Sequence, residues 1–127
     1  MNIFGIGTDI VSVNRIKNSL KNKNFISRIF NEKEILKCKR IKNSSNCYAK
    51  RFAAKEAFSK ALGTGISKGI NFDEIIVHNI KTGKPKIKLL GNTKKKVIKL
   101  LKKKNIKIFV SLSDDKPFAV ATVVISI

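Results

Sequence analysis

The sequence predicts an α+β fold in two layers, with most helices in the first half of the chain and antiparallel strands in the second. Between residues 13 and 62, apolar residues recur at helical spacing. After residue 70 the apolar runs are short and are separated by turn residues such as Gly83 and Pro85. Neither an internal repeat nor a long linker divides the 127 residues, so we expect a single domain over residues 1–127.

The first half of the chain is predicted to form one strand and four helices. In order, they are a strand over residues 2–13 interrupted at Thr8-Asp9, an amphipathic helix containing Ile16 and Leu20, a short helix over 25–30, a helix over 31–41 and a helix over 45–62. Asn31 and Glu34 fit the two positions of a capping box. Gly63 follows the long, alanine-rich helix and is placed to terminate it.

The second half is predicted to form two hairpins with a helix between them. The elements are strands over residues 72–77 and 86–90, a lysine-rich helix from Asn92 or Thr93 to about Lys103, and strands over 106–113 and 118–127. The turns are Thr82-Gly83-Lys84-Pro85 and Asp114-Asp115-Lys116-Pro117. We expect the lysine-rich helix to pack through an apolar stripe of Val97, Ile98, Leu100 and Leu101.

The net charge of +20, from 28 basic and 8 acidic residues, favours a polyanionic partner but does not identify one. Part of the charge has a simpler explanation, because 24 Lys, 12 Asn and 19 Ile are typical of a composition dominated by AT-rich codons. The excess of Lys over the 4 Arg is unfavourable for specific DNA recognition, in which arginine is the commonest contact to guanine.

The termini and cysteines predict a cytoplasmic protein. The N-terminus lacks the basic and apolar regions of a signal peptide, and no apolar run approaches the roughly 20 residues that span a bilayer. Cys38 and Cys47 suit neither a metal cluster nor a disulfide framework. We therefore expect both to be buried thiols, as a reducing compartment would leave them.

Three charged residues are candidates for phosphate chemistry. Glu56 and Lys60 lie one helical turn apart, although Glu placed four residues before Lys is also the order of an ordinary surface ion pair. Asp9 follows a short apolar run and has its own structural alternative, as a turn or N-cap residue. Two carboxylates beside a lysine would suit Mg²⁺ and a phosphate. The turn over residues 63–69 lacks the spacing of a P-loop.

The chain carries two ordered motifs: Gly7-Thr8-Asp9 near the N-terminus, and Phe52, Lys55, Glu56 and Lys60 in the middle. With these it resembles the holo-(acyl-carrier-protein) synthases, the small class of 4'-phosphopantetheinyl transferases, whose signatures are Gly-x-Asp and Phe/Trp-x-x-Lys-Glu-x-x-x-Lys. The resemblance covers nearly the whole chain and includes Ala61-Leu62-Gly63-Thr64-Gly65, Gly83-Lys84-Pro85 and Ser111-Leu112-Ser113. It implies a fold with antiparallel strands packed on the long motif helix.

The chain departs from the family at one visible position. The family usually carries a histidine after Ser-x-Ser, where this chain has Asp114, so a contact at that position does not carry over. His78, the only histidine, lies in a predicted strand, where we expect a structural role.

The resemblance implies that Asp9 and Glu56 hold Mg²⁺ on the pyrophosphate of coenzyme A, with Lys60 compensating charge beside it. The reaction implied is transfer of the 4'-phosphopantetheine arm to a serine of apo-acyl carrier protein, in fatty acid biosynthesis, with release of adenosine 3',5'-bisphosphate. Such a reaction depends on positioning and charge compensation. Either Glu56 or a metal-bound water could take the serine proton.

The resemblance also implies the remaining contacts and the assembly. The coenzyme A contacts would be Arg51, Lys60, Gly63, Lys84 and Pro85. The acidic carrier protein would meet a basic surface formed by Arg15, Lys21 and Arg28, where charge complementarity raises the association rate. The protein would be a homotrimer with sites between neighbouring protomers, and would need neither a membrane nor nucleic acid.

Two other classes remain as alternatives. A small basic nucleic-acid-binding protein would explain the lysine runs at 94–96 and 102–104. However, no aromatic residue lies within three residues of either run to stack on bases, and Asp9 and Glu56 would be unexplained. A purely structural interaction module would explain the core but not the spacing of the motifs.

Overall fold

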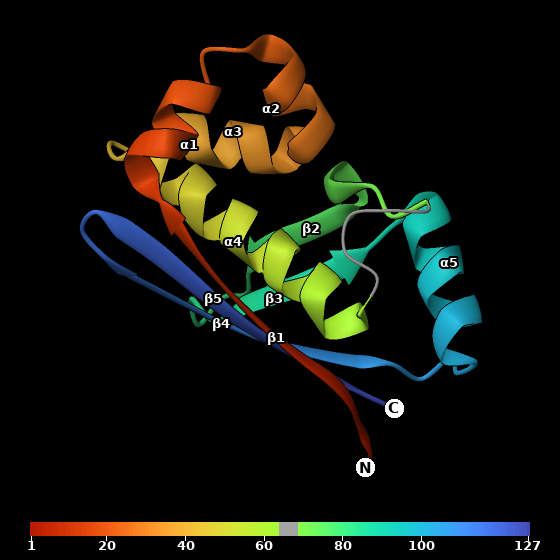
Figure 1. Cartoon of the computed structure of the whole chain (residues 1–127). Helices are drawn as coiled ribbons and strands as arrows, with labels where there is room; N and C mark the ends of the chain where they lie inside the picture. Colours follow the sequence, from red (N-terminus) through yellow and green to blue (C-terminus); the bar gives the residue numbers. More distant parts are fainter. Residues whose placement is uncertain (64–68) are drawn as a thin grey trace.

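Figure 1 shows the computed structural model of the protein, which describes residues 1–63 and 69–127. The elements in chain order are β1 (Ile3–Ser12), α1 (Val13–Ser19), α2 (Lys23–Ile29), α3 (Glu32–Arg40), α4 (Ser44–Leu62), the 3₁₀ helix η1 (Phe72–Glu74), β2 (Ile75–Asn79), β3 (Pro85–Leu89), α5 (Gly91–Leu101), β4 (Lys107–Asp115) and β5 (Phe118–Ser126). The expected α+β class is confirmed. The expected family match at Thr64-Gly65 lies outside the described residues.

The strands form two antiparallel units. One is a three-stranded sheet with the order β1-β5-β4, and the other is the pair β2-β3. Both predicted hairpins are therefore confirmed, but the strand expected over 72–77 begins only at Ile75, after the 3₁₀ helix η1. Strand β1 joins the C-terminal hairpin across almost the whole length of the chain. Strand β1, near the N-terminus, thus lies beside β5, near the C-terminus. This pairing places Gly7-Thr8-Asp9 in the three-stranded sheet.

The predicted interruption of the first strand at Thr8-Asp9 is wrong. β1 continues through this point, with Thr8 opposite Thr122 and Asp9 opposite Ala121. The polar pair fits a strand because successive side chains point to opposite faces of the sheet. The Thr8 hydroxyl donates a hydrogen bond to the carbonyl oxygen of Ala121 at 3.1 Å, while Asp9 points to the face covered by a helix.

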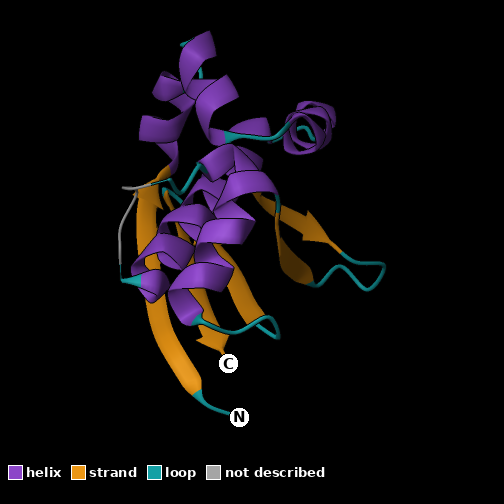
Figure 2. Ribbon diagram, turned by 90° about the vertical axis from the view of Figure 1, so that its right-hand side faces the viewer, coloured by secondary structure: helices purple, strands orange, loops and turns teal. Residues whose placement is uncertain are grey.

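Helix α4 is the central element of the fold. It lies across one face of the three-stranded sheet and beside β2, with α1, α2 and α3 gathered at its N-terminal end (Figures 1 and 2). The side chain of Asn43 caps its N-terminus, and Gly63 ends it with a φ of 81°, as the sequence predicted. Two apolar clusters form the core, and α4 contributes to both of them.

The opposite face of the three-stranded sheet carries exposed apolar side chains. On β1, Ile6 and Ile10 are 64% and 60% exposed. Their partners across the sheet, Val124 and Val120, share this face, and Phe109 of β4 lies beside Val124. Within the described residues the helices cover the other face of the sheet (Figure 2). Exposed apolar faces are commonly found at interaction surfaces.

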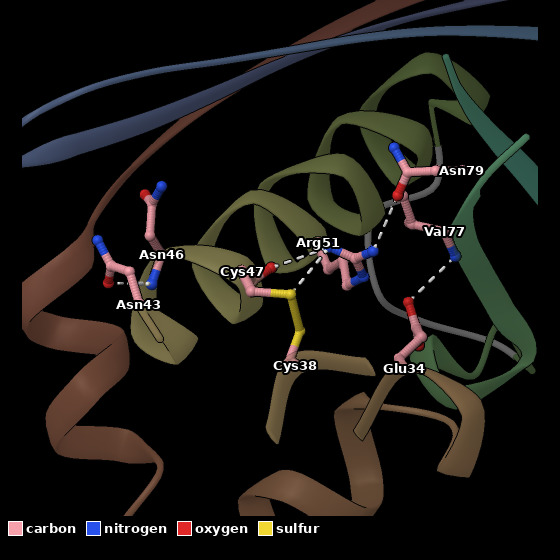
Figure 3. The surroundings of a disulfide bond; sticks show 8 residues. All are labelled: Glu34, Cys38, Asn43, Asn46, Cys47, Arg51, Val77 and Asn79. Carbon is pink, nitrogen blue, oxygen red and sulfur yellow. Dashed lines mark hydrogen bonds between the residues drawn. A yellow bond between two sulfur atoms is a disulfide. The ribbon is translucent and has the colours of Figure 1, made fainter. Parts of the chain in front are cut away.

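Cys38 and Cys47 are joined by a disulfide that links α3 to α4, so the expectation of free thiols is wrong (Figure 3). The expectation of burial is confirmed, because the two residues are 0% and 4% exposed. A spacing of nine residues did not indicate pairing in the sequence. The bond forms because α3 and α4 fold back on each other, which brings the two Cα atoms to 5.5 Å.

Two details of the helices test the sequence patterns further. The capping box of α3 is present, with Asn31 and Glu34 in the predicted positions. On α5, Val97 and Leu101 are buried as expected, but Leu100 is 45% exposed. Adjacent residues are about 100° apart on a helix, so the face that buries Leu101 turns Leu100 outward.

Candidate active site

The two motifs meet where β1 crosses α4 at backbone distance. A Cβ atom on Gly7 would overlap the carbonyl oxygen of Ala57, and one on Gly5 would overlap that of Ala61. Ala57 and Ala61 are themselves small and buried. Because neither element has a larger side chain at the crossing, the strand rests directly on the helix. This contact fixes the position of Asp9 relative to the charged residues of α4.

Asp9 and Lys60 form an ion pair across this contact. The Nζ atom of Lys60 donates hydrogen bonds to Oδ1 of Asp9 at 3.1 Å and to the carbonyl oxygen of Thr8 at 3.0 Å. The carboxylate is mostly buried, with 14% of its side chain exposed, whereas the lysine side chain is 53% exposed. Lys60 does not form the simple surface pair with Glu56, because it pairs with Asp9 of β1 instead.

Glu56 is the second carboxylate of the site. Burial raises its pKa, the nearby charge of Asp9 raises it further, and Lys60 acts in the opposite direction. Glu56 precedes Ala57, whose carbonyl oxygen lies against Gly7, so it stands on the part of α4 that β1 crosses. Oδ2 of Asp9 is buried and has no hydrogen-bond partner. Two mutually repelling carboxylates, one with an unsatisfied buried oxygen, form a site that a cation would stabilise.

Lys55, the remaining charged residue of the second motif, has a structural role. Its ammonium group is fully buried and donates three hydrogen bonds, to Oε1 of Glu34 at 2.6 Å and to the carbonyl oxygens of Phe72 and Ile75 at 2.7 and 2.8 Å. Burial lowers its pKa and Glu34 opposes that change. All three protons are used, so Lys55 joins α4 to α3 and β2.

The partner of Lys55, Glu34, was not recognised from the sequence as more than a capping residue. Its Oε1 also accepts from the backbone N–H of Asn31. Its Oε2 accepts from the N–H of Val77 at 3.0 Å (Figure 3). The signal that could have indicated a further role is the scarcity of acids in the chain. A carboxylate among so many lysines has a ready partner.

Arg51, an expected coenzyme A contact, lies on a different side of α4 from Glu56. Five residues separate them, which at about 100° per residue places their side chains roughly 140° apart around the helix. The guanidinium is buried and points towards β2 (Figure 3). Its Nη1 donates to the carbonyl oxygen and sulfur of Cys47, and its Nη2 donates to Oδ1 of Asn79 at 3.2 Å.

Asn79 connects Arg51 to the turn that contains two other expected coenzyme contacts, Lys84 and Pro85. The amide of Asn79 donates to the carbonyl oxygen of Gly83 at 2.8 Å, inside the turn between β2 and β3. Lys84 is exposed there, and with Pro85 it lines a small cavity beside β4. The turn is therefore fixed to α4, but no hydrogen bond or ion pair between described residues joins it to Asp9, Glu56 and Lys60, which we call the Asp9 cluster. Gly63 lies at the end of α4, three residues after Lys60.

The three expected contacts to a carrier protein are all exposed. Arg15 lies on α1, Lys21 follows it and Arg28 lies on α2. Arg15 also lines a cavity of about 200 Å³ with the aromatic rings of Phe25 and Phe52. Ile10, the residue after Asp9, forms part of the wall of this cavity.

Asp114, which replaces the family's usual histidine, ties β4 to the N-terminal end of α4. It accepts a hydrogen bond from Asn46 at 3.1 Å and pairs with Lys50 at 3.3 Å. The Asn46 hydrogen bond lowers its pKa most, burial opposes this, and the hydrogen bond and charge of Lys50 lower the pKa further. His78 is exposed on β2 and lies outside the Asp9 cluster.

Comparisons with known proteins give the family. The family model described as the 4'-phosphopantetheinyl transferase superfamily matches residues 5–123. A holo-[acyl-carrier-protein] synthase of Pelagibacter ubique is 50% identical over 125 residues, which cover 98% of each chain. A second synthase of that name, from Buchnera aphidicola, is 47% identical over 127 residues.

Solved structures agree with this result. The crystal structure of holo-[acyl-carrier-protein] synthase from Neisseria meningitidis has a TM-score of 0.87 and 37% identity, and covers 99% of this chain and 100% of its own. A synthase from Bacillus anthracis in complex with CoA (3',5'-ADP) has a TM-score of 0.80 and 39% identity, covering 97% and 96% of the two chains.

The chain therefore belongs to the 4'-phosphopantetheinyl transferase superfamily and, within it, to the holo-[acyl-carrier-protein] synthases. The two motifs identified from the sequence are the ones that the structure joins at the crossing of β1 and α4. The alternative of a nucleic-acid-binding protein gains no support from these matches. Among the described helices, none has the length and apolar character needed to cross a membrane.

Proposed function

We propose that this protein transfers the 4'-phosphopantetheine arm of coenzyme A to a serine of apo-acyl carrier protein and releases adenosine 3',5'-bisphosphate, a step in fatty acid biosynthesis. The observation that supports it most directly is the convergence of Asp9, Glu56 and Lys60 at one backbone contact. Membership of the synthase family supplies the reaction class. We treat residues 1–127 as one transferase domain, because α4 contributes to both core clusters.

Mg²⁺ fits the residues at this site. The described residues contain no cluster of three or more His, Cys, Asp or Glu side chains that would enclose a metal completely. Mg²⁺ does not need one, since it commonly binds one or two carboxylates and completes its octahedron with waters and phosphate oxygens. The unpartnered Oδ2 of Asp9 and the carboxylate of Glu56 would hold it. When bound, the ion would neutralise charge on the pyrophosphate of coenzyme A.

The chain's own residues would orient and stabilise the reacting groups. Lys60 is exposed enough to reach a phosphate while its ammonium group is held by Asp9 and the carbonyl oxygen of Thr8. Its charge would offset the negative charge that develops during transfer. Glu56 would accept the serine proton directly or through a water. Lys84, Pro85 and Gly63 are proposed coenzyme contacts.

The carrier protein would dock on the exposed cations of the first two helices. Arg15, Lys21 and Arg28 form a basic surface on the side of the molecule that holds the Phe25 and Phe52 rings. An acidic partner would be attracted to this surface before it reaches Asp9, which raises the rate of association more than the affinity.

We also propose that the protein assembles as a homotrimer through the open face of the three-stranded sheet. This face presents Ile6, Ile10 and Phe109 to solvent, and burying them would stabilise an assembly. Light scattering coupled to gel filtration should give three times the mass of 14.2 kDa. Ile6→Glu should dissociate the assembly, while Leu36→Glu, at a similarly exposed position on α3, should leave it intact. A wild-type monomer at assay concentration would contradict the proposal.

We propose the cytoplasmic location that the sequence predicts, and the redox state of the two cysteines provides a direct test. Cys38 and Cys47 form a disulfide in the structure, whereas cytoplasmic cysteines are usually reduced. Alkylation of thiols before lysis, followed by peptide mass analysis, should find both residues alkylated if the compartment is reducing. Recovery of an intact disulfide under these conditions would argue against the cytoplasm.

The decisive experiment for the function uses intact mass. The protein is incubated with apo-acyl carrier protein, coenzyme A and Mg²⁺, and the carrier should gain the mass of one phosphopantetheine group. A chelator should abolish the gain, and added Mg²⁺ should restore it. An unmodified carrier, in a sample that a known transferase does modify, would rule the function out.

A further inference from the structure

The Cys38–Cys47 disulfide is one of two connections between α3 and α4 (Figure 3). The other is the buried ion pair of Lys55 with Glu34, whose Nζ and Oε1 atoms are 2.6 Å apart. Lys55 also donates hydrogen bonds to backbone carbonyl oxygens of η1 and β2. The two helices therefore remain joined when the disulfide opens. The bond can change its redox state while the fold stays in place.

The two sulfur atoms have different surroundings. Nη1 of Arg51 donates a hydrogen bond to Sγ of Cys47 at 3.2 Å, and no such bond from a described residue reaches Sγ of Cys38 (Figure 3). Both cysteines belong to the same apolar cluster. A thiol in apolar surroundings stays protonated and inert, whereas a neighbouring arginine favours the reactive thiolate. Once the bond is reduced, Cys47 is therefore the more nucleophilic of the two.

Arg51 has no anion in contact with it. The guanidinium is 5% exposed, and none of the ion pairs between described residues includes it. Its remaining hydrogen bonds go to carbonyl oxygens of Cys47 and Asn79, and its Nε is buried without a partner. Glu34 acts on it only at longer range, because that carboxylate is paired with Lys55. A buried cation without a contacting anion is costly, and a thiolate on Cys47 would supply the anion.

We propose that Cys38 and Cys47 form a reversible redox switch that sets the charge beside Arg51. In the reduced form, the thiolate of Cys47 compensates the charge of the guanidinium. In the disulfide form, the sulfur is neutral and the guanidinium is free to attract another anion. The oxidant is a peroxide, because Cys47 is 4% exposed and admits only a molecule close to water in size.

The oxidation has two steps. The thiolate sulfur of Cys47 attacks one oxygen of hydrogen peroxide, the O–O bond breaks, and a sulfenic acid and hydroxide form; the hydroxide takes up a proton and becomes water. The thiol of Cys38 then attacks the sulfur of the sulfenic acid. The S–S bond forms, and the sulfenic oxygen leaves with the thiol proton as a second water. A dithiol reverses the change by thiol–disulfide exchange and is itself oxidised to a disulfide.

A path of hydrogen bonds connects the switch to the turn between β2 and β3. Nη2 of Arg51 donates to Oδ1 of Asn79 at 3.2 Å, and the amide of Asn79 donates to the carbonyl oxygen of Gly83 at 2.8 Å. The disulfide form should therefore bind coenzyme A more tightly than the reduced form. This consequence rests on the proposed function, with Arg51 as the coenzyme contact that the sequence predicts.

The sulfur chemistry is tested first, without transfer. Protein reduced with dithiothreitol and then freed of it is treated with hydrogen peroxide. The intact mass should fall by two hydrogen atoms, and neither cysteine should react with iodoacetamide after denaturation. The chain has one methionine, whose oxidation would instead add an oxygen atom. Cys38→Ser should trap Cys47 as a sulfenic acid that dimedone labels, whereas Cys47→Ser should leave Cys38 unlabelled.

Substitutions of Arg51 test why Cys47 reacts. Arg51→Gln should slow the reaction with peroxide at least about tenfold, and Arg51→Lys, which keeps the charge, should restore most of the rate. The matched variant Lys50→Gln removes the same charge from the neighbouring residue, which pairs with Asp114, and should change the rate less than about twofold. Circular dichroism of each variant shows whether it is folded. Equal rates for Arg51→Gln and Arg51→Lys in folded protein would overturn the role of the arginine.

The effect on the coenzyme is measured last. The disulfide form should have a KM for coenzyme A at least about threefold lower than the reduced form, since one opposing charge beside Arg51 is removed. The double variant Cys38→Ser, Cys47→Ser should give the same KM with and without peroxide. Equal KM values for the two wild-type forms would overturn the switch, as would cysteines that stay reduced in peroxide. Absence of transfer by both forms would contradict the proposed function instead, and the loss of two hydrogen atoms would still be observed.

Discussion

Helix α4 carries three lysines that each pair with a carboxylate from another element, and two of these pairs, Lys55–Glu34 and Lys60–Asp9, differ in almost every physical respect. Lys55 and Glu34 are fully buried, and all three ammonium protons of Lys55 are bound. Lys60 is 53% exposed, and its partner Asp9 keeps one buried oxygen without a hydrogen bond. The first pair is complete and holds elements together, whereas the second is incomplete and can accept a ligand.

The largest effect is expected from breaking the complete pair. Lys55→Met removes the charge and leaves Glu34 buried without its partner, which typically costs about 3–5 kcal/mol of stability. Urea denaturation should show this loss as a lower midpoint. Glu34→Gln combined with Lys55→Met should recover part of it, because neither charge then remains. A single variant as stable as the wild type would show that the pair does not hold α4 to α3.

The incomplete pair should respond in activity instead of stability. Asp9→Asn and Glu56→Gln should each lower the rate of transfer about 100-fold or more, since each removes a proposed ligand of the metal. Their free energies of unfolding in urea should stay within about 1 kcal/mol of the wild type, as for other partly exposed polar sites. Ser59→Ala on the same helix serves as a control for local packing. Full activity of either variant would exclude that residue from the site.

Lys60→Ala should lower kcat more than it raises the KM for coenzyme A, because its contact strengthens as charge develops during transfer. The loss of its exposed ion pair should cost only about 0.2–1 kcal/mol of stability. Steady-state kinetics with varied coenzyme A measure both constants. A change confined to KM would mean that Lys60 only holds the substrate.

The pH dependence of stability gives a smaller effect on the same site. The folded-state pKa of Glu56 is raised above the ordinary value of 4.5, so folding favours its protonated form. The unfavourable contribution of its charge is absent at pH below 4.5 and develops as the pH rises through the folded-state value. Without metal, Glu56→Gln should therefore be more stable than the wild type at pH 7 and equal to it at pH 4. Thermal melts with a chelator test this, and the opposite sign would contradict the raised pKa.

The smallest effect is expected at the docking surface. Arg15→Glu should raise the KM for the carrier protein several-fold and weaken its dependence on salt, since an exposed charge acts over a screening length of about 8–10 Å. Lys95→Glu on α5 makes the same change of charge away from this surface and should have a weaker effect. If Arg15→Glu altered neither KM nor salt dependence, the basic charge of α1 would have no role in docking.

The comparison also shows which features can be predicted from sequence. The long helix, its terminating Gly63 and the capping box of α3 were correct because each depends on neighbouring residues. Asp9, Glu56 and Lys60 were candidates from their residue types and positions, and the resemblance to a family added their roles; the ion pair of Asp9 with Lys60 appears only in the structure. The pairs Lys55–Glu34 and Cys38–Cys47 were missed, because they depend on how helices fold back on each other.

The glycines at the crossing of β1 and α4 have a consequence for how the protein can change over evolutionary time. Asp9 lies close to α4 because Gly5 and Gly7 have no side chains, so no substitution elsewhere can replace their role. Substitutions to lysine, asparagine or isoleucine at exposed positions therefore leave this crossing unchanged, because the two glycines meet only backbone atoms of α4. The arrangement of the site is most sensitive to substitution at Gly5 and Gly7, where one added methyl group would push β1 away from α4.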